Sequence, residues 1–129
     1  MQYLKTNHYR DKNLLAMAEK KQCLFRVPGV CFGNPETTVA AHSNEGRHGK
    51  GKGIKAQDHY SAWACVNCHS WYDTSGASYE DKHEAFETAH RRQVIAWDAI
   101  SESDSESTKD RHSATQALIE LDRDASFNG

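Results

Sequence analysis

The sequence predicts a small α+β protein whose thin core is held together by a bound zinc ion. At 129 residues the chain has room for one domain, and its mean hydropathy of −0.85 leaves few apolar side chains to bury. Small cores of this kind usually need a cross-link, and four cysteines are available to form one. Strand-like and helix-like patterns both occur along the chain, which indicates the α+β class.

The distribution of apolar residues excludes two classes of protein. No apolar run approaches the ~18 residues of a membrane span, so we expect no membrane partner. Residues 1–10 contain no apolar segment of the kind that secretory signals carry, so the expected location is the cytoplasm. Because the cytoplasm keeps thiols reduced, four cysteines there indicate metal ligation before disulfides.

The net charge of −2 conceals a difference between the two ends of the chain. Residues 101–129 carry a net charge of −4, whereas residues 1–100 carry +2 and seven of the eight histidines. A sequence pI near 6.4 therefore does not exclude a nucleic-acid partner. We divide the chain into an N-terminal helical extension (1–19), a main domain (20–100) and an acidic, flexible tail (101–129).

The N-terminal half is predicted to hold one short helix followed by extended segments. Residues 11–21 predict a helix that Asp11 can cap, because apolar side chains recur on one face. Residues 23–31 predict two extended pieces separated by a Pro-Gly turn, and residues 37–42 have the β-branched content of a strand. The glycine- and lysine-rich residues 43–57 predict a mobile basic loop.

The C-terminal half is predicted to be mostly helical. Residues 58–64 indicate a helical turn that leads into residues 65–73, a cysteine knuckle that opens a helix. A longer helix with a serine cap is expected over residues 78–100. The Ser/Glu/Asp-rich residues 101–109 predict a disordered linker, and residues 113–123 a last short helix.

The cysteines form one C-x7-C pair and one C-x2-C pair: Cys23, Cys31, Cys65 and Cys68. A tight C-x-x-C lets two thiolates converge at ~2.3 Å on a tetrahedral zinc ion, and the Pro-Gly turn can fold the looser pair toward it. A structural zinc would then cross-link the N-terminal segment to the start of a helix. Four ordinary reduced thiols are the plain alternative. Residues 65–69 also fit C-x-x-C-H, so a c-type haem carrier is a third interpretation.

Three other residues form a candidate catalytic group. His42 ends the predicted strand, and His69 follows the knuckle with Asp73 four residues later. That spacing places His69 and Asp73 on one helical face, where both can bind one divalent ion. Such a pair, with a strand histidine as general base, is one way to build a one-metal phosphodiester hydrolase. Structural or surface roles for these side chains are the alternative.

The basic loop offers a surface for phosphates. Its glycines permit close approach of the backbone, and its candidate DNA-binding side chains are Arg47, Lys50, Lys52 and Lys55. No aromatic-rich reading surface is evident, so we expect contacts to the DNA backbone and to its shape. A solvated flexible loop without a partner is the alternative.

The chain resembles a known protein family over residues 23–42, which include the stretch P-G-V-C-F-G-N-P-E-T-T, and over Cys65-Val66-Asn67-Cys68-His69 with Asp73. This is the YbcO-like family of small phage and prophage proteins, which is related to Ref-type RecA-dependent nucleases and to the HNH (ββα-metal) group. The resemblance covers about residues 20–100.

The resemblance implies a small zinc-stapled HNH-like ββα-metal fold with flanking helices. It also implies a metal-dependent DNA endonuclease linked to recombination, with a RecA-type recombinase as an expected partner. By position, His42 matches the general base, His69 and Asp73 the ligands of a catalytic Mg, Mn or Zn ion, and the cysteines the structural zinc site. Ala41 stands where these nucleases commonly carry another metal ligand, and the middle Asn of the motif would fall near Tyr60, with Asp58 and His59 as the nearest polar candidates. The alternative is therefore a catalytically inactive zinc-stapled module that binds DNA or protein.

Overall fold

The computed structural model describes residues 8–51 and 53–128, and within them it confirms the α+β class. These residues form four α-helices, two short 3₁₀ turns and a two-stranded sheet. In chain order the elements are α1 (Lys12–Ala16), η1 (Pro35–Thr37), β1 (Val39–His42), η2 (Gly46–His48), β2 (Ser61–Ala64), α2 (Val66–Thr74), α3 (Tyr79–Ser101) and α4 (Thr108–Asn128). None of the described helices is long and apolar enough to cross a membrane.

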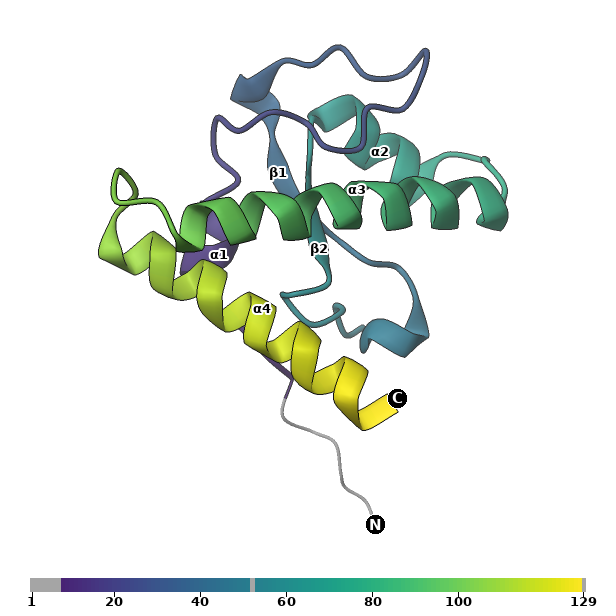
Figure 1. Ribbon diagram of the computed structural model, residues 1–129. Helices are drawn as coiled ribbons and strands as arrows, with labels where there is room; N and C mark the ends of the chain where they lie inside the picture. The colour runs from purple at the N-terminus through teal and green to yellow at the C-terminus, as the bar shows by residue number, and fades with distance from the viewer. Residues whose placement is uncertain (1–7, 52, 129) are drawn as a thin grey trace.

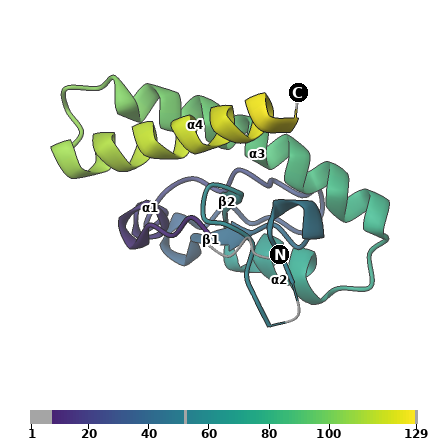
Figure 2. The same ribbon diagram turned by 90° about the horizontal axis from the view of Figure 1, so that it is seen from below.

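Two layers make up the molecule. In Figure 1, α3 and α4 lie in front of the sheet and α1, and Figure 2 shows the same two helices above a layer of α1, the sheet and α2. The core lies between the layers, where Leu14 of α1, Tyr72 of α2 and Phe86 and Trp97 of α3 are buried. Phe25 joins them, because its ring packs against both Tyr72 and Phe86. One core therefore unites the first helix with the central ones.

The sheet is one antiparallel pair of strands, which runs from Val39 opposite Ala64 to His42 opposite Ser61. The prediction of a helical turn over residues 58–64 is wrong, because the last four of them form β2. Alanine has no preference for strands, so pairing with β1 and complete burial decide the local conformation here. Tertiary contacts, which a local sequence pattern does not contain, explain this difference.

Helices α2 and α3 begin where the sequence predicts. α2 follows Cys65, and α3 is capped by Ser78, whose Oγ accepts a hydrogen bond from the backbone N–H of Asp81 at 3.0 Å. Ile95 lies off the apolar face of the predicted helix and is 70% exposed. β1, β2 and α2 thus follow one another as strand, strand and helix, and α3 packs against β2.

The C-terminal region differs from its prediction. In place of a disordered linker and flexible tail, residues 102–107 form a hydrogen-bonded turn that leads directly into α4. Arg111 closes this turn, since its guanidinium donates to the carbonyl oxygens of Ser103 and Glu106 at 3.2 and 2.8 Å. The predicted short helix over residues 113–123 therefore extends in both directions.

Small buried side chains explain why α4 is docked and not free. Ala114 and Ala117 are completely buried, which lets α4 approach α3 closely. Asn13 ties α4 to α1 as well, because its Nδ2 donates to Asp110 Oδ1 and Ser113 Oγ, each at 3.0 Å. Three of the seven acids of residues 101–129 precede α4, and of the four within it only Asp122 is exposed, so the acidic composition does not mark a free tail.

The N-terminal helix is shorter than predicted, but its cap is confirmed. The carboxylate of Asp11 accepts a hydrogen bond from the backbone N–H of Leu14 at 3.1 Å. Leu14, Met17 and Ala18 are all buried in the core. α1 therefore belongs to the same packed unit as the residues that follow it.

Candidate functional site

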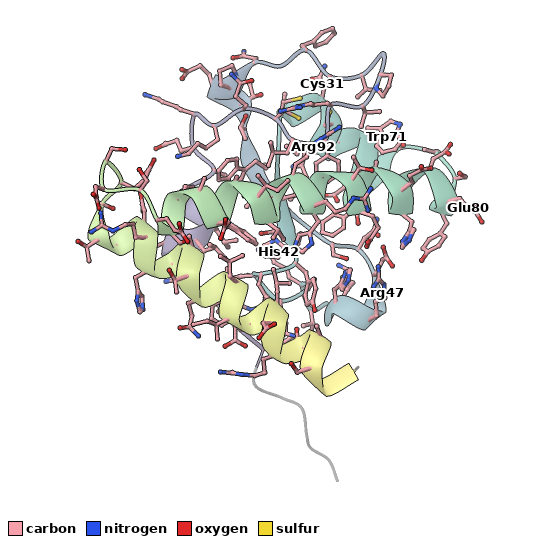
Figure 3. All side chains as sticks on the ribbon, viewed as in Figure 1. Cys31, His42, Arg47, Trp71, Glu80 and Arg92 are labelled. Carbon is pink, nitrogen blue, oxygen red and sulfur yellow. The ribbon has the colours of Figure 1, made fainter. Side chains whose placement is uncertain are left out.

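The four cysteines Cys23, Cys31, Cys65 and Cys68, called the cysteine cluster below, converge at the start of α2. Their sulfur atoms all lie within 4.8 Å of one another, and the sulfurs of Cys31 and Cys65 are 3.8 Å apart. Four sulfurs at ~2.3 Å from a tetrahedral zinc ion would be separated by about 3.8 Å. The donor set and its spacing therefore fit a structural metal. In Figure 3 the sulfur atoms gather beside the Cys31 label.

A tight turn brings the C-x7-C pair to the knuckle. Gly29 has a left-handed φ of 76° in the predicted Pro-Gly turn, a conformation that favours glycine. The backbone N–H groups of Val30 and Cys31 both donate to the carbonyl oxygen of Val27, at 3.0 and 2.9 Å. The turn therefore reverses the chain, so that Cys31 meets Cys65.

The surroundings of the cysteine cluster favour ionisation of the Cys65 thiol over that of Cys68. Burial by itself would raise the pKa of the Cys65 thiol, but hydrogen bonds from the backbone N–H of Cys68 and from neighbouring thiols lower it to about 7. Burial raises the pKa of Cys68. Because zinc binds thiolates, loading the cluster with metal must release protons.

A second site directly follows the knuckle and is called the histidine cavity below. It is a cavity of about 860 Å³ whose lining includes His42 from β1 and His69 and Asp73 from α2. Lys50 and Lys55, from the loop between the strands, line it as well. The fold thus gathers the three candidate catalytic residues and two of the candidate DNA-binding lysines around one cavity. Figure 3 shows His42 near the middle of the molecule, well apart from Cys31.

The ring of His42 is held by a buried carboxylate. Its Nε2 lies 2.8 Å from Oδ1 of Asp58, whose side chain is only 3% exposed. Burial alone would raise the pKa of Asp58, but the hydrogen bonds from His42 and from the backbone N–H of Asp11, with the charges of His42 and Arg10, hold it below its usual value. The family resemblance makes Asp58 one of two polar candidates for the middle position of the HNH motif, but its spacing from His42 carries no signal of this contact.

His69 and Asp73 meet as their i, i+4 spacing predicts. His69 Nε2 and Asp73 Oδ2 are 2.9 Å apart on the exposed side of α2. The imidazole nitrogen and the carboxylate oxygen can both coordinate one cation. The remaining coordination positions would go to water or to phosphate oxygens, as is usual for Mg²⁺. Among the described residues no third His, Cys, Asp or Glu ligand atom lies within 4.8 Å of both. The pair therefore fits an open, weakly held divalent ion.

Arg47 lies outside the cavity lining and is occupied by two carboxylates. Its guanidinium contacts Glu45 Oε1 at 2.9 Å and Glu87 Oε2 at 2.6 Å. Glu45 also accepts a hydrogen bond from His83 Nδ1 at 2.8 Å, so these charges satisfy one another. Figure 3 places Arg47 on η2, at the edge of the molecule. The predicted DNA contact of Lys52 lies outside the described residues.

Comparison with known proteins identifies relatives for most of the chain. Residues 12–104 match the profile of a family described as "Putative nuclease YbcO". Two curated relatives, "Putative nuclease YbcO" of Escherichia coli strain K12 and "Putative nuclease ybcO" of Enterobacteria phage 82, are each 40% identical over 88 residues. Each match covers 64% of this chain and 88% of the relative. The matched family residues end before α4 begins.

A solved structure supports the fold of the matched part. It is titled as a "putative bacteriophage protein" from Escherichia coli K-12 substrain MG1655 and is 30% identical to this chain. The superposition has a TM-score of 0.51 and covers 63% of this chain and 90% of the other.

Proposed function

Since the chain belongs to the family described as "Putative nuclease YbcO", we propose that it is a metal-dependent DNA endonuclease of the HNH type, encoded by a phage or prophage. The observation that carries the proposal is the histidine cavity, which joins a general-base candidate, a metal-ligand pair and two lysines. These are the groups that hydrolysis of a phosphodiester requires. The strand, strand and helix order of β1, β2 and α2 supports an HNH-like arrangement.

Each residue of the cavity has a role in this proposal. His42 takes the proton of the attacking water, because its Nε2 is engaged by Asp58 and Nδ1 remains to accept. Lys50 and Lys55 bind the phosphates that flank the scissile bond. His69 and Asp73 hold a divalent ion, Mg, Mn or Zn, which supplies charge stabilisation at the phosphate when bound.

The cysteine cluster has a structural role in this proposal. Cys23 and Cys31 come from the segment before β1, whereas Cys65 and Cys68 open α2. A zinc ion held by these four thiolates would fix α2 against the N-terminal segment. The same helix carries the metal-ligand pair, so the cluster would set the position of the catalytic ion.

A nicking assay tests the proposed function. Supercoiled and single-stranded DNA are incubated with Mg, Mn or Zn and either the wild type or His42→Ala. His112→Ala, a change on the exposed side of α4, is the matched control. We expect cleavage by the wild type and the control, and none by His42→Ala at unchanged zinc content. Equal cleavage by His42→Ala and the wild type would contradict the assignment of the base.

One observation favours a second candidate, a zinc-stapled module that binds DNA or protein without cleaving it. Ala41 is completely buried and offers no ligand next to His42, so a metal has few protein donors. A wild type that binds DNA and zinc but leaves every substrate intact would support this module. The link to recombination is tested in the same assay with single-stranded DNA coated by a RecA-type recombinase, where cleavage only of coated DNA is the expected sign of that partner.

A further inference from the structure

We propose that Asp58 is a positioning residue for His42, and that Arg10 and the backbone of Asp11 hold it in place from outside the family-matched residues. This inference rests on the proposed function, because it concerns the general base of the same reaction. It gives Asp58, a polar candidate for the middle position of the HNH motif, a specific role toward His42, and it adds a segment that precedes the family-matched residues.

The geometry of the contact fixes the ring of His42. An ionised carboxylate can only accept hydrogen bonds, so His42 Nε2, 2.8 Å from Asp58 Oδ1, must be the donor. In the neutral ring the proton therefore sits on Nε2, which leaves the lone pair of Nδ1 free to accept a proton. No described residue makes a hydrogen bond to Nδ1, and His42 lines the cavity.

Asp58 is itself held on every side. Its Oδ2 accepts from the backbone N–H of Asp11 at 2.7 Å, and its Oδ1 also accepts from Arg10 Nη1 at 3.2 Å. Its backbone N–H donates to Tyr9 O at 3.0 Å, and its carbonyl accepts from Ser61 Oγ at 2.7 Å. A carboxylate clamped this firmly can impose one orientation on a partner ring, which a mobile side chain cannot.

The clamp comes from a part of the chain that precedes the family match. Residues 9–11 lie before the matched range, which begins at residue 12. Arg10 also donates to the carbonyl oxygens of Ala56 and Lys55, at 2.5 and 2.9 Å. The segment therefore fastens the end of the basic loop as well as Asp58, so it sets both the base and one phosphate-binding lysine.

Asp58→Asn tests the proposal, since the side chain keeps its size but gains a donor. If the amide NH₂ faces His42, Nε2 must accept and the ring proton moves to Nδ1, the atom needed as base. If the amide oxygen faces His42, the NH₂ opposes the N–H of Asp11. Glu45→Gln is the matched control, because Glu45 is a buried acid that also accepts from a histidine and an arginine and does not line the cavity.

Two readouts separate a positioning role from a structural one. Nitrogen-15 NMR of the histidine rings reports which nitrogen of His42 carries the proton, and steady-state cleavage at varied DNA concentration separates kcat from KM. We expect Asp58→Asn to move the proton or to populate both tautomers, and to lower kcat by about 10- to 100-fold with KM within about threefold. Glu45→Gln should leave the tautomer and kcat unchanged.

The two readouts also separate failure of this proposal from failure of the proposed function. An Asp58→Asn protein whose His42 keeps its proton on Nε2, or whose kcat equals that of the wild type, would overturn the positioning role. A wild type without any nuclease activity would overturn the proposed function, while the NMR measurement would still decide whether Asp58 sets the ring of His42. A fall in kcat of the same size in Glu45→Gln would count against Asp58, because general loosening of the fold would explain both.

Discussion

The cysteine cluster and the histidine cavity share α2, but they differ in how much of the rest of the protein each one needs. All four ligands of the cluster converge within 4.8 Å and require no further side chain to complete a tetrahedral site. The cavity, in contrast, depends on Asp58 to orient His42 and on Arg10 to hold Asp58. The cysteine cluster thus holds a complete set of candidate metal ligands, whereas the proposed catalytic group of the cavity extends into its supporting residues.

This difference predicts that loss of the cysteine cluster affects the histidine cavity, but not the reverse. The cluster sits at the first turn of α2, and the metal-ligand pair of the cavity lies on the same helix. Loss of the cluster should therefore disturb the cavity, because it releases the helix that carries the pair. Loss of the pair should leave the cluster intact, because its sulfurs do not depend on His69 or Asp73.

The largest effect is expected from Cys68→Ala, which removes one thiolate ligand. Structural zinc in small domains contributes ~10–16 kcal/mol of apparent binding free energy, comparable to the whole stability of a domain. We expect the variant to lose its zinc and its cooperative thermal unfolding. Zinc per chain, measured by atomic absorption, and far-ultraviolet circular dichroism check this. A variant with one zinc per chain and the unfolding midpoint of the wild type would show that the cluster is no staple.

Substitution of His69 or Asp73 should weaken binding of the proposed divalent ion at the histidine cavity and leave the cysteine cluster intact. His69→Ala and Asp73→Ala each remove one donor to the proposed divalent ion, and we expect cleavage about 100-fold slower or more. Zinc content and thermal midpoint should match those of His112→Ala, which serves as control. Cleavage at the wild-type rate by both variants would move the catalytic ion away from α2.

The sequence predicts the cysteine cluster more completely than it predicts the cavity. The C-x-x-C spacing and the Pro-Gly turn contain the local geometry of each cysteine pair, and the four ligands that zinc needs predict that the two pairs meet, although Cys31 and Cys65 are 34 positions apart. His69 and Asp73 are likewise fixed by helical spacing. The contact between His42 and Asp58 joins residues 16 positions apart through the pairing of β1 and β2, which no local pattern contains.

Because local sequence patterns do not contain long-range contacts, two elements of the fold also differ from their predictions. The sequence predicts a helical turn where β2 lies, since Ser61 to Ala64, with two alanines, acquire their strand conformation from pairing with β1 and from burial. The sequence predicts only a short helix over residues 113–123 within a flexible tail, since an acidic composition does not reveal that Ala114 and Ala117 fit closely against α3. Segments whose order comes from contacts distant in sequence are the ones that composition predicts poorly.

A change of pH should destabilise the part of the protein around η2, next to the cavity. Burial, with the charge of Arg47, lowers the pKa of His48 to about 4, whereas an unfolded histidine titrates near ~6.5. The unfolded state therefore binds a proton first, and stability falls as the pH drops below 6.5 until it reaches about 4. Between pH 6.5 and 5 this histidine should lower the unfolding free energy by about 1.5 kcal/mol.

Chemical denaturation of the wild type and of His48→Gln at pH 7, 6 and 5 measures this contribution. Burial lowers the pKa of His90 too, so the variant should retain part of the pH dependence. The expected result is a shallower fall of the unfolding free energy in His48→Gln, with zinc content measured at each pH to separate any loss of metal. Identical slopes for both proteins would mean that His48 is not kept neutral by the fold.

The smallest effect is expected at the contact between α4 and the segment that carries Asp58. Asp124 Oδ2 accepts hydrogen bonds from His59 Nε2 and from the hydroxyl of Tyr60, both at 2.8 Å, and these residues follow Asp58 in the chain. Asp124→Asn keeps one acceptor and loses the charge, so we expect a loss of about 1 kcal/mol and a thermal midpoint lower by roughly 3–5 °C.

Asp124→Asn also tests whether α4, which lies outside the family-matched residues, supports the histidine cavity. If α4 only stabilises the fold, Asp124→Asn will lower the midpoint and leave kcat, zinc content and the His42 tautomer as in the wild type. Asp122→Asn, an exposed acid on the same helix, controls for the loss of one negative charge. A fall in kcat in Asp124→Asn but not in Asp122→Asn would instead extend the support of the histidine cavity into the C-terminal helix. The residues that hold the general base would then come from both ends of the chain, with the family-matched core between them.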